Sequence, residues 1–437
     1  MKRYRIIIAV AVLCLLLSGC KELSLNSEEL LSPPSADGKQ AEIQSLIEQN
    51  SGGSYTLIYP SSGEYKSAVV YYDIDGDGSE EAIAMYSTGD DSSRILVARR
   101  GDSGYAMLGE GKIKSSLIEK IFFSDLNGDG TKEIILDYPE SNSPLLSLTV
   151  LIASDKLAQR DLPTSCSEYI CGDFNGDEID ELMLLALNSS VSTASARLIT
   201  YSDSELVETA ACEMDTAVSA FAKITYGVIG DSKKGIVIDG RSSTGDYSTQ
   251  AIYYDEGSHS LINPLFVYSG YQSTRRTTPI YSGDVDRDEI IEIPICNYSD
   301  YTPKENVSTV CMRVTWNNYS PATLELVSKK TALLCEELGF MLNISDDRVG
   351  DITARYVNKN TVTVYAWDFK GDDLTRTDPL LTIHYYPKES YDSSKIIEAV
   401  LCETNTGVYT YIIEPTENYT PFSDDEVTGG FALLDTR

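Results

Sequence analysis

The chain has 437 residues, with 67 acidic against 35 basic side chains and a formal net charge of −32. A surface this acidic repels phosphate backbones, so the sequence argues against a nucleic-acid partner. Only two histidines are present, which argues against a multi-histidine metal site and against a histidine-based catalytic triad.

The N-terminal residues 1–19 are typical of an export signal. Three basic residues within the first five positions precede an apolar run over residues 6–17 that is too short to span a bilayer. The run ends in Leu17-Ser18-Gly19-Cys20, which resembles the lipobox of bacterial lipoproteins and implies cleavage before Cys20 and lipidation of its thiol. We therefore expect an exported protein, anchored by lipid to the cell membrane and facing outward. Residues 20–54 would form the lipidated cysteine and a tether, with a short helix over residues 41–49.

A nine-residue acidic motif occurs four times, beginning at Asp73, Asp125, Asp173 and Asp284. We refer to these copies as the first, second, third and last loop. In each of them, side chains with oxygen atoms stand at positions one, three, five and nine. Alternate residues of a tight loop turn inward, and the backbone carbonyl at position seven can add an oxygen, so the spacing suits a hard cation.

An EF-hand is the obvious alternative to this interpretation. It requires a bidentate glutamate at position twelve, followed by a helix. Position twelve is Ala84 in the first loop and Leu136 in the second. A short apolar run, such as residues 82–85, follows each loop and is typical of a strand. The sequence therefore places each loop at the entry to a sheet.

The acidic motif belongs to a longer repeat. The closing acids Glu81, Glu133 and Glu181 are 52 and 48 residues apart, and Glu292 follows after 111, about twice that period. A degenerate unit fills the gap, with Gly235 in place of the closing acid, so we expect it to keep its strands and to lack the ion. Five units of short antiparallel strands predict a β-propeller of about five blades over residues 55–328.

These tandem loops resemble the FG-GAP and VCBS families, the calcium-loop blades of integrin α-subunit heads and of many bacterial surface proteins. The resemblance implies a propeller with about four structural Ca²⁺ ions at one rim. Two copies depart from the family pattern, because Glu178 and Glu289 stand where the turn usually has glycine. Carried over position by position, the implied ligands, with position seven contributing its carbonyl, are Asp73, Asp75, Asp77, Ser79 and Glu81; Asp125, Asn127, Asp129, Thr131 and Glu133; Asp173, Asn175, Asp177, Ile179 and Glu181; and Asp284, Asp286, Asp288, Ile290 and Glu292.

From residue 333 onward the acidic loops stop and alternating strands continue, for example over residues 340–344 and 361–367. Residues 422–434 are expected to form a terminal helix. The sequence therefore predicts a mainly β protein in which a small α+β domain over residues 333–437 follows the repeats.

Seven cysteines lie beyond Cys20, an odd number scattered through apolar runs without Cys-x-x-Cys spacing. This pattern favours buried thiols over a zinc site or a disulfide framework. A local bridge between Cys166 and Cys171 is the alternative.

The repetition of the carboxylates also bears on function. Clustered acids can serve acid–base catalysis, but a catalytic pair occurs once in a chain, whereas these side chains recur in every intact unit. We therefore predict that the protein is not an enzyme and that the propeller is a binding, adhesion or scaffolding module for a protein or glycan ligand. The alternative is a hydrolase or lyase that acts on envelope polysaccharide.

Overall fold

The computed structural model describes residues 38–140, 143–188, 192–267, 274–297, 310–370 and 373–434. The export signal, the lipobox and Cys20 lie outside the described residues, so the structure does not test those predictions. Within the described ranges, no helix is long and apolar enough to cross a membrane.

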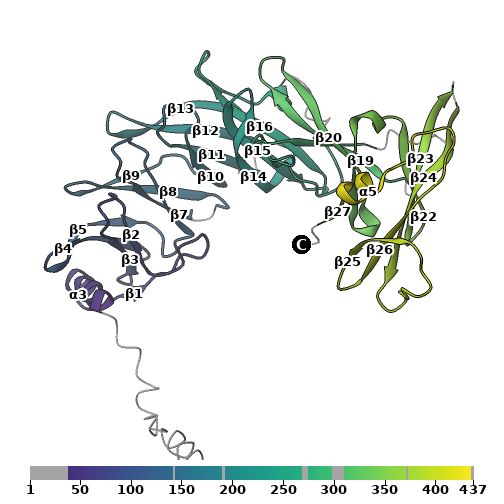
Figure 1. Ribbon diagram of the computed structural model, residues 1–437. Coiled ribbons are helices and arrows are strands. Elements are labelled where there is room, and N and C mark those ends of the chain that lie inside the picture. The colour runs from purple at the N-terminus through teal and green to yellow at the C-terminus, as the bar shows by residue number, and fades with distance from the viewer. Residues whose placement is uncertain are drawn as a thin grey trace, which may run out of the picture.

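The fold is mainly β, as predicted, and the described residues form six antiparallel sheets. Figure 1 shows the sheets side by side in a row. In the first sheet, β1 and β2 pair with one edge of β3. Strand β4 pairs with the other edge of β3, and β5 pairs with β4. The strands of the first four sheets are β1 (Thr56–Leu57), β2 (Val69–Tyr72), β3 (Glu81–Ser87), β4 (Ser93–Gly101) and β5 (Gly104–Ile113); β6 (Lys120–Ser124), β7 (Glu133–Pro139), β8 (Leu146–Ala153) and β9 (Leu157–Asp161); β10 (Glu168–Gly172), β11 (Glu181–Asn188), β12 (Thr193–Ser202) and β13 (Glu205–Glu213); and β14 (Val218–Gly230), β15 (Lys233–Ser242), β16 (Tyr247–Asp255) and β17 (Ser260–Ile262).

A separate apolar layer joins each pair of neighbouring sheets along the row. In β3, Ile83 and Met85 face the second sheet, whereas Ala82, Ala84 and Tyr86 face the opposite side, because side chains alternate along a strand. Equivalent layers join the second sheet to the third, the third to the fourth and the fourth to the fifth. Central strands are therefore buried on both faces, which explains why they read as continuous apolar runs.

Helix α3 (Gly38–Ser51) covers the outer face of the first sheet. Its Ile43 and Ile47 are 0% and 1% exposed and pack in the same cluster as Ala82 and Ala84. In a closed propeller, this face would pack against the last blade. Figure 1 shows instead an open arc, with α3 at one end and the C-terminal sheet at the other. The described residues therefore do not close the predicted ring, and the predicted tether ends in a helix that is part of the folded core.

The fourth sheet keeps its strands, as expected of the degenerate unit. Asp231 and Ser232 join β14 directly to β15, and both have positive φ, at 46° and 61°. Positive φ at both central residues is typical of a two-residue hairpin turn. This turn takes the place of the nine-residue acidic loop.

The fifth sheet is built differently from the first four. The strand before its loop is reduced to a single bridge between Gly283 and Glu292. The predicted boundary between residues 328 and 333 falls within β20, and residues 340–344 complete the sheet. Its strands are β18 (Ile293–Asn297), β19 (Met312–Ser320), β20 (Glu325–Cys335), β21 (Phe340–Ile344) and β27 (Phe431–Leu433).

A buried ion pair holds residues 274–283 against the fourth sheet. Arg276 Nη2 lies 2.7 Å from Asp239 Oδ1, and both side chains are 0–1% exposed. Asp239 also accepts hydrogen bonds from Thr249 Oγ1 and from the backbone amide of Ser282. Arg276 Nε donates to the carbonyl of Ile280. The segment that leads into the last loop is thereby fixed to its neighbour by satisfied polar contacts.

The C-terminal sheet shares its core with the fifth sheet. One apolar cluster joins Leu333 and Phe340 of the fifth sheet to Val364, Leu381 and Tyr409 of the C-terminal sheet. The strands of that sheet are β22 (Ile352–Asn358), β23 (Thr361–Lys370), β24 (Asp373–Pro387), β25 (Ala399–Glu403) and β26 (Gly407–Ile413). The predicted α+β region is thus packed onto the end of the row.

Short helices complete the described fold. Helix α5 (Asp424–Gly430) begins with a capping box between Ser423 and Glu426. Arg348 donates to both carboxylate oxygens of Glu426, at 3.0 and 3.1 Å, and ties this helix to the C-terminal core. The helix is shorter than the 422–434 predicted from the sequence, because β27 follows directly. The remaining helices are α4 (Pro264–Val267), η3 (Glu336–Leu338) and η4 (Asp346–Arg348).

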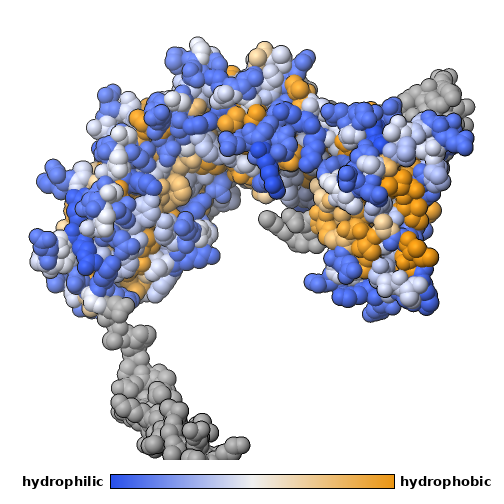
Figure 2. All heavy atoms as spheres, viewed as in Figure 1, coloured by the Kyte–Doolittle hydropathy of each residue, from blue (hydrophilic) through white to orange (hydrophobic). Residues whose placement is uncertain are grey.

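The surface of the row is mostly hydrophilic, as Figure 2 shows, and an apolar patch lies over the C-terminal sheet. Exposed apolar side chains of that sheet include Val357, Val400 and Ile412.

The seven cysteines beyond Cys20 are free thiols. Among them, the Sγ atoms of Cys311 and Cys335 lie 3.4 Å apart in the C-terminal core.

A buried carboxylate lies between the second and third sheets. Asp137 is 0% exposed, and the Nζ atom of Lys120 lies 3.8 Å from its Oδ2, beyond hydrogen-bonding distance. Lys120 Nζ is closer to Glu168 Oε1, at 3.0 Å. Burial raises the pKa of Asp137 to about 7, against the effect of Lys120, and the charges of Glu168 and Glu119 raise it further.

Asp137→Asn is expected to stabilise the protein at pH 8. The folded-state pKa exceeds the unfolded value of about 3.9, so ionisation of Asp137 opposes folding progressively as the pH rises from about 4 through 7. The variant should have a free energy of unfolding higher by about 1–3 kcal/mol at pH 8 and no gain at pH 4. Urea unfolding at both pH values measures this, and equal effects at pH 4 and pH 8 would contradict it.

Candidate metal-binding loops

The four acidic loops occupy equivalent places in the fold. The first three connect β2 to β3, β6 to β7 and β10 to β11, and the last loop leads into β18. In each loop the backbone amide of position two donates a hydrogen bond to Oε2 of the closing glutamate, while the side chain of position two packs in an apolar core. The donors are Ile74 at 3.1 Å, Leu126 at 2.8 Å, Phe174 at 2.9 Å and Val285 at 2.8 Å.

The first and last loops gather three carboxylates each. Asp73, Asp75 and Glu81 bring oxygens within 4.8 Å of one another, and so do Asp284, Asp286 and Glu292. Glu81 and Glu292 are fully buried, and their Oε1 atoms have no hydrogen-bond partner within the part of the chain that the structure describes. A buried carboxylate oxygen without a partner is costly. A hard cation between the three carboxylates would satisfy it, so these residues fit such an ion.

The second and third loops differ at position three. Asn127 Nδ2 donates to Glu133 Oε1 at 2.7 Å, and Asn175 Nδ2 donates to Glu181 Oε1 at 2.6 Å. A carboxamide binds a hard cation through its oxygen. In these two loops the asparagine therefore has to rotate before it can join a ligand set.

Positions five and seven act together in all four loops. The aspartate at position five accepts a hydrogen bond from the backbone amide at position seven, which holds the turn. The pairs are Asp77 with Ser79, Asp129 with Thr131, Asp177 with Ile179 and Asp288 with Ile290. The structure thus brings positions one, three and nine together in the first and last loops and leaves position five bonded to the backbone.

The closing glutamates are less acidic than ordinary carboxyl groups. Burial, reinforced by the neighbouring aspartates, raises the pKa of Glu133, Glu181 and Glu292 to about 7. Burial also raises the pKa of Glu81. A bound cation would lower the pKa of these glutamates, because it favours the ionised carboxylate.

Basic side chains from neighbouring strands approach three of the loops. Arg99 Nε lies 3.7 Å from Glu81 Oε1, Lys234 Nζ lies 2.8 Å from Asp173 Oδ2, and Lys329 Nζ lies 3.1 Å from Asp288 Oδ2. Sequence analysis missed these partners because each comes from another strand, up to 61 residues away, and no motif marks it. Their charges offset part of the repulsion within the loops.

The two departures from glycine at position six leave the backbone conformation there unchanged. Glu178 and Glu289 have φ values of 69° and 68°, in the left-handed region that Gly78 and Gly130 occupy at the same position. An L-residue is strained there by roughly 1–2 kcal/mol. The loop geometry is therefore retained against local strain.

Glu289→Gly is expected to raise the free energy of unfolding by about 0.5–1 kcal/mol, because relief of the strain exceeds the greater freedom of glycine in the unfolded chain. Glu325, which is exposed at the start of β20 with an ordinary φ, is the matched control. Glu325→Gly should lower stability by a similar amount. Chemical denaturation of the two variants measures both effects, and destabilisation by Glu289→Gly would refute the argument.

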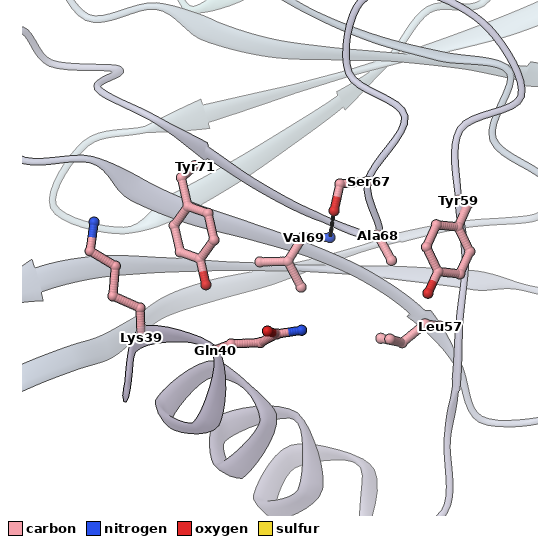
Figure 3. Close-up of a pocket in the computed structure, with 8 residues that line it drawn as sticks. All are labelled: Lys39, Gln40, Leu57, Tyr59, Ser67, Ala68, Val69 and Tyr71. Carbon is pink, nitrogen blue, oxygen red and sulfur yellow. Dashed lines mark hydrogen bonds between the residues drawn. The ribbon is translucent and has the colours of Figure 1, made fainter. Parts of the chain in front are cut away.

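A cleft of about 370 Å³ lies between α3 and the first sheet. Figure 3 shows Tyr71 and Tyr59 on opposite sides of it, with Gln40 reaching from α3 toward the space between them. Tyr59 is 62% exposed. The buried hydroxyl of Tyr71 has no hydrogen-bond partner among the described residues. Lys39, at the edge of the cleft, is paired with Glu80 of the first loop at 3.0 Å.

No model of a protein family matches the sequence, and no curated protein matches it either.

Proposed function

We propose that this chain is an exported, lipid-anchored and non-catalytic binding, adhesion or scaffolding module whose acidic loops bind Ca²⁺. The observation that carries the proposal is the pair of fully buried carboxylate oxygens, on Glu81 and Glu292, that face clustered aspartates without a hydrogen-bond partner among the described residues. Only oxygen ligands are offered, which is the preference of Ca²⁺. The flexible coordination of Ca²⁺ also suits loops that differ at position three.

We further infer that the repeats correspond to calcium-loop blades of the FG-GAP and VCBS type. Their strand order, their acidic loops and their period of about 50 residues support this assignment. About four ions would be bound, since the fourth unit has a tight turn in place of the loop. The same ligand pattern recurs in successive units, which favours a structural role of the ion over a catalytic one.

Calorimetric titration of the protein, without its signal peptide, with CaCl₂ tests the proposal. We expect three or four sites, and the double variant Glu81→Gln/Glu292→Gln should lose two of them, because an amide cannot replace a bidentate carboxylate. Absence of heat and of any bound ion in equilibrium dialysis would contradict calcium binding.

The cleft between α3 and the first sheet is where we place a glycan ligand. Tyrosine rings offer apolar faces with polar tips, and Gln40 and the Tyr71 hydroxyl supply further hydrogen-bonding groups. A panel of neutral polysaccharides in affinity electrophoresis should retard the protein without release of reducing ends. Tyr59→Ala should abolish the retardation, and Tyr281→Ala, at a tyrosine 38% exposed elsewhere, should not. Turnover of a polysaccharide would favour the enzyme alternative.

Lipid anchoring has its own test. Mature protein should be recovered with membranes and should carry labelled fatty acid at Cys20. Cys20→Ser should release it into the soluble fraction. Unlabelled wild-type protein in the soluble fraction would contradict the anchor.

A further inference from the structure

Backbone hydrogen bonds connect successive acidic loops. The amide of position eight in the second loop, Lys132 N, donates to the carbonyl of Ile74 in the first loop at 2.7 Å. The amide of position eight in the third loop, Asp180 N, donates to the carbonyl of Asp125 in the second loop at 3.3 Å. Each connection therefore joins the residue before one closing glutamate to position one or two of the preceding loop.

The first connection forms an unbroken path between two ligand sets. Ile74 donates its amide to the Glu81 carboxylate and accepts the Lys132 amide at its carbonyl. Lys132 directly precedes Glu133, so two hydrogen bonds connect the two closing glutamates. Lys132 Nζ also donates to Tyr72 Oη, one residue before Asp73, at 2.7 Å.

Side chains strengthen the second connection. Ser124 Oγ donates to Asp180 Oδ2 at 2.5 Å, and Ser124 directly precedes Asp125. The side chain of Ile179, at position seven of the third loop, lies over Gly128 of the second loop so closely that a Cβ atom on Gly128 would be 2.7 Å from Ile179 Cδ1. The second and third loops are thus in direct contact.

The last loop has a different neighbour. Its position-eight amide, Ile291 N, donates to the carbonyl of Val228 at 2.8 Å. Val228 belongs to the fourth sheet, where the turn at Asp231 and Ser232 replaces the acidic loop. Within the described residues, the equivalent hydrogen bond of the last loop therefore leads to a unit without a ligand set.

From this arrangement we propose that the first three loops bind Ca²⁺ as a coupled set and that the last loop binds it independently. The inference rests on the proposed calcium binding. An ion fixes position one and the closing glutamate of its loop, and so orders the carbonyl or amide that the neighbouring loop uses. The neighbour then loses less conformational freedom when it binds its own ion, which is positive coupling.

Hydrogen exchange followed peptide by peptide during a calcium titration tests the proposal, because each loop reports its own midpoint. In Glu133→Gln, which disables the second loop, the calcium midpoints of the first and third loops should rise at least fivefold. The midpoint of the last loop should stay unchanged. In Glu292→Gln, only the last loop should lose protection.

Asp180→Ala serves as a second variant, since it removes the contact with Ser124 and alters no candidate ligand. It should raise the midpoints of the second and third loops and leave that of the last loop unchanged. Unshifted midpoints in both Glu133→Gln and Asp180→Ala would overturn the coupling while calcium binding stands. A shift of equal size in the last loop would also overturn it, as a general loss of stability. No calcium-dependent protection in any loop of the wild type would overturn both the coupling and the proposed function.

Discussion

Arg276→Met is expected to lower the free energy of unfolding by about 3–5 kcal/mol, because it leaves the Asp239 carboxylate buried without its cation. Asp239 is 1% exposed and lies in β15, a strand of the fourth sheet whose side chains pack against both neighbouring sheets. The guanidinium also holds the carbonyls of Thr274 and Ile280. Its loss should therefore release the segment that leads into the last loop.

Urea unfolding measures this effect, and Arg275→Met is the matched control. The neighbouring Arg275 pairs with Asp246 at the surface, where its side chain is 59% exposed. Surface ion pairs contribute about 0–1 kcal/mol, so the control should change stability little. Equal effects of the two variants would show that the buried pair does not hold the fifth unit to the fourth.

The double variant Ile43→Ala/Ile47→Ala is expected to cost about 4 kcal/mol or more. Each substitution removes a fully buried side chain from the contact between α3 and the first sheet, and large-to-small changes of this kind cost roughly 2–5 kcal/mol each. The helix should detach and leave Ala82, Ala84 and Tyr86 exposed to water. Hydrogen exchange in β3 and thermal unfolding measure this, with the exposed Glu48→Ala on the same helix as the control.

This variant also tests the open arc. If the first sheet packed against the fifth in a closed ring, its outer face would remain covered without α3. Unchanged exchange in β3 would then be expected. Increased exchange confined to β3 and its neighbours would support α3 as the cover of the row.

The succession of antiparallel sheets was predictable because it depends on local patterns. Apolar runs of strand length, two-residue turns and the fixed spacing from each aspartate to its closing glutamate are all visible in the sequence, and they place the loops between the first and second strands. The unit with Gly235 in place of an acid was also expected to keep its strands, and these form the fourth sheet. Each of these signals lies within about 50 residues of chain.

The open arc was not predictable from the same patterns. Ring closure depends on what covers the outer face of the first sheet, and α3 has only two buried residues, Ile43 and Ile47, to signal its contact. The pair of Arg276 and Asp239 joins residues 37 positions apart, and no motif marks either of them. The predicted C-terminal boundary lies within β20, because that strand continues through residues 328–333 without a change in pattern.

Within the loops, the sequence placed the carboxylates but not their hydrogen bonds. The spacing could not show that Asn127 and Asn175 donate to the closing glutamates, whereas Asp75 and Asp286 gather with them. Nor could it show that Glu178 and Glu289 adopt positive φ. These features depend on side-chain orientation and on strain that the rest of the fold sustains.

The most direct test of the account is thermal unfolding of the mature protein in calcium and in chelator, with magnesium at equal ionic strength as the control. Each site contributes about 2.7 kcal/mol when calcium is at a hundred times its dissociation constant. Several such sites should raise the melting temperature by about 10 °C or more relative to chelator. Magnesium should reproduce little of this. A melting temperature that is the same in calcium, magnesium and chelator would mean that the acidic loops are turns without an ion, and the account would be wrong.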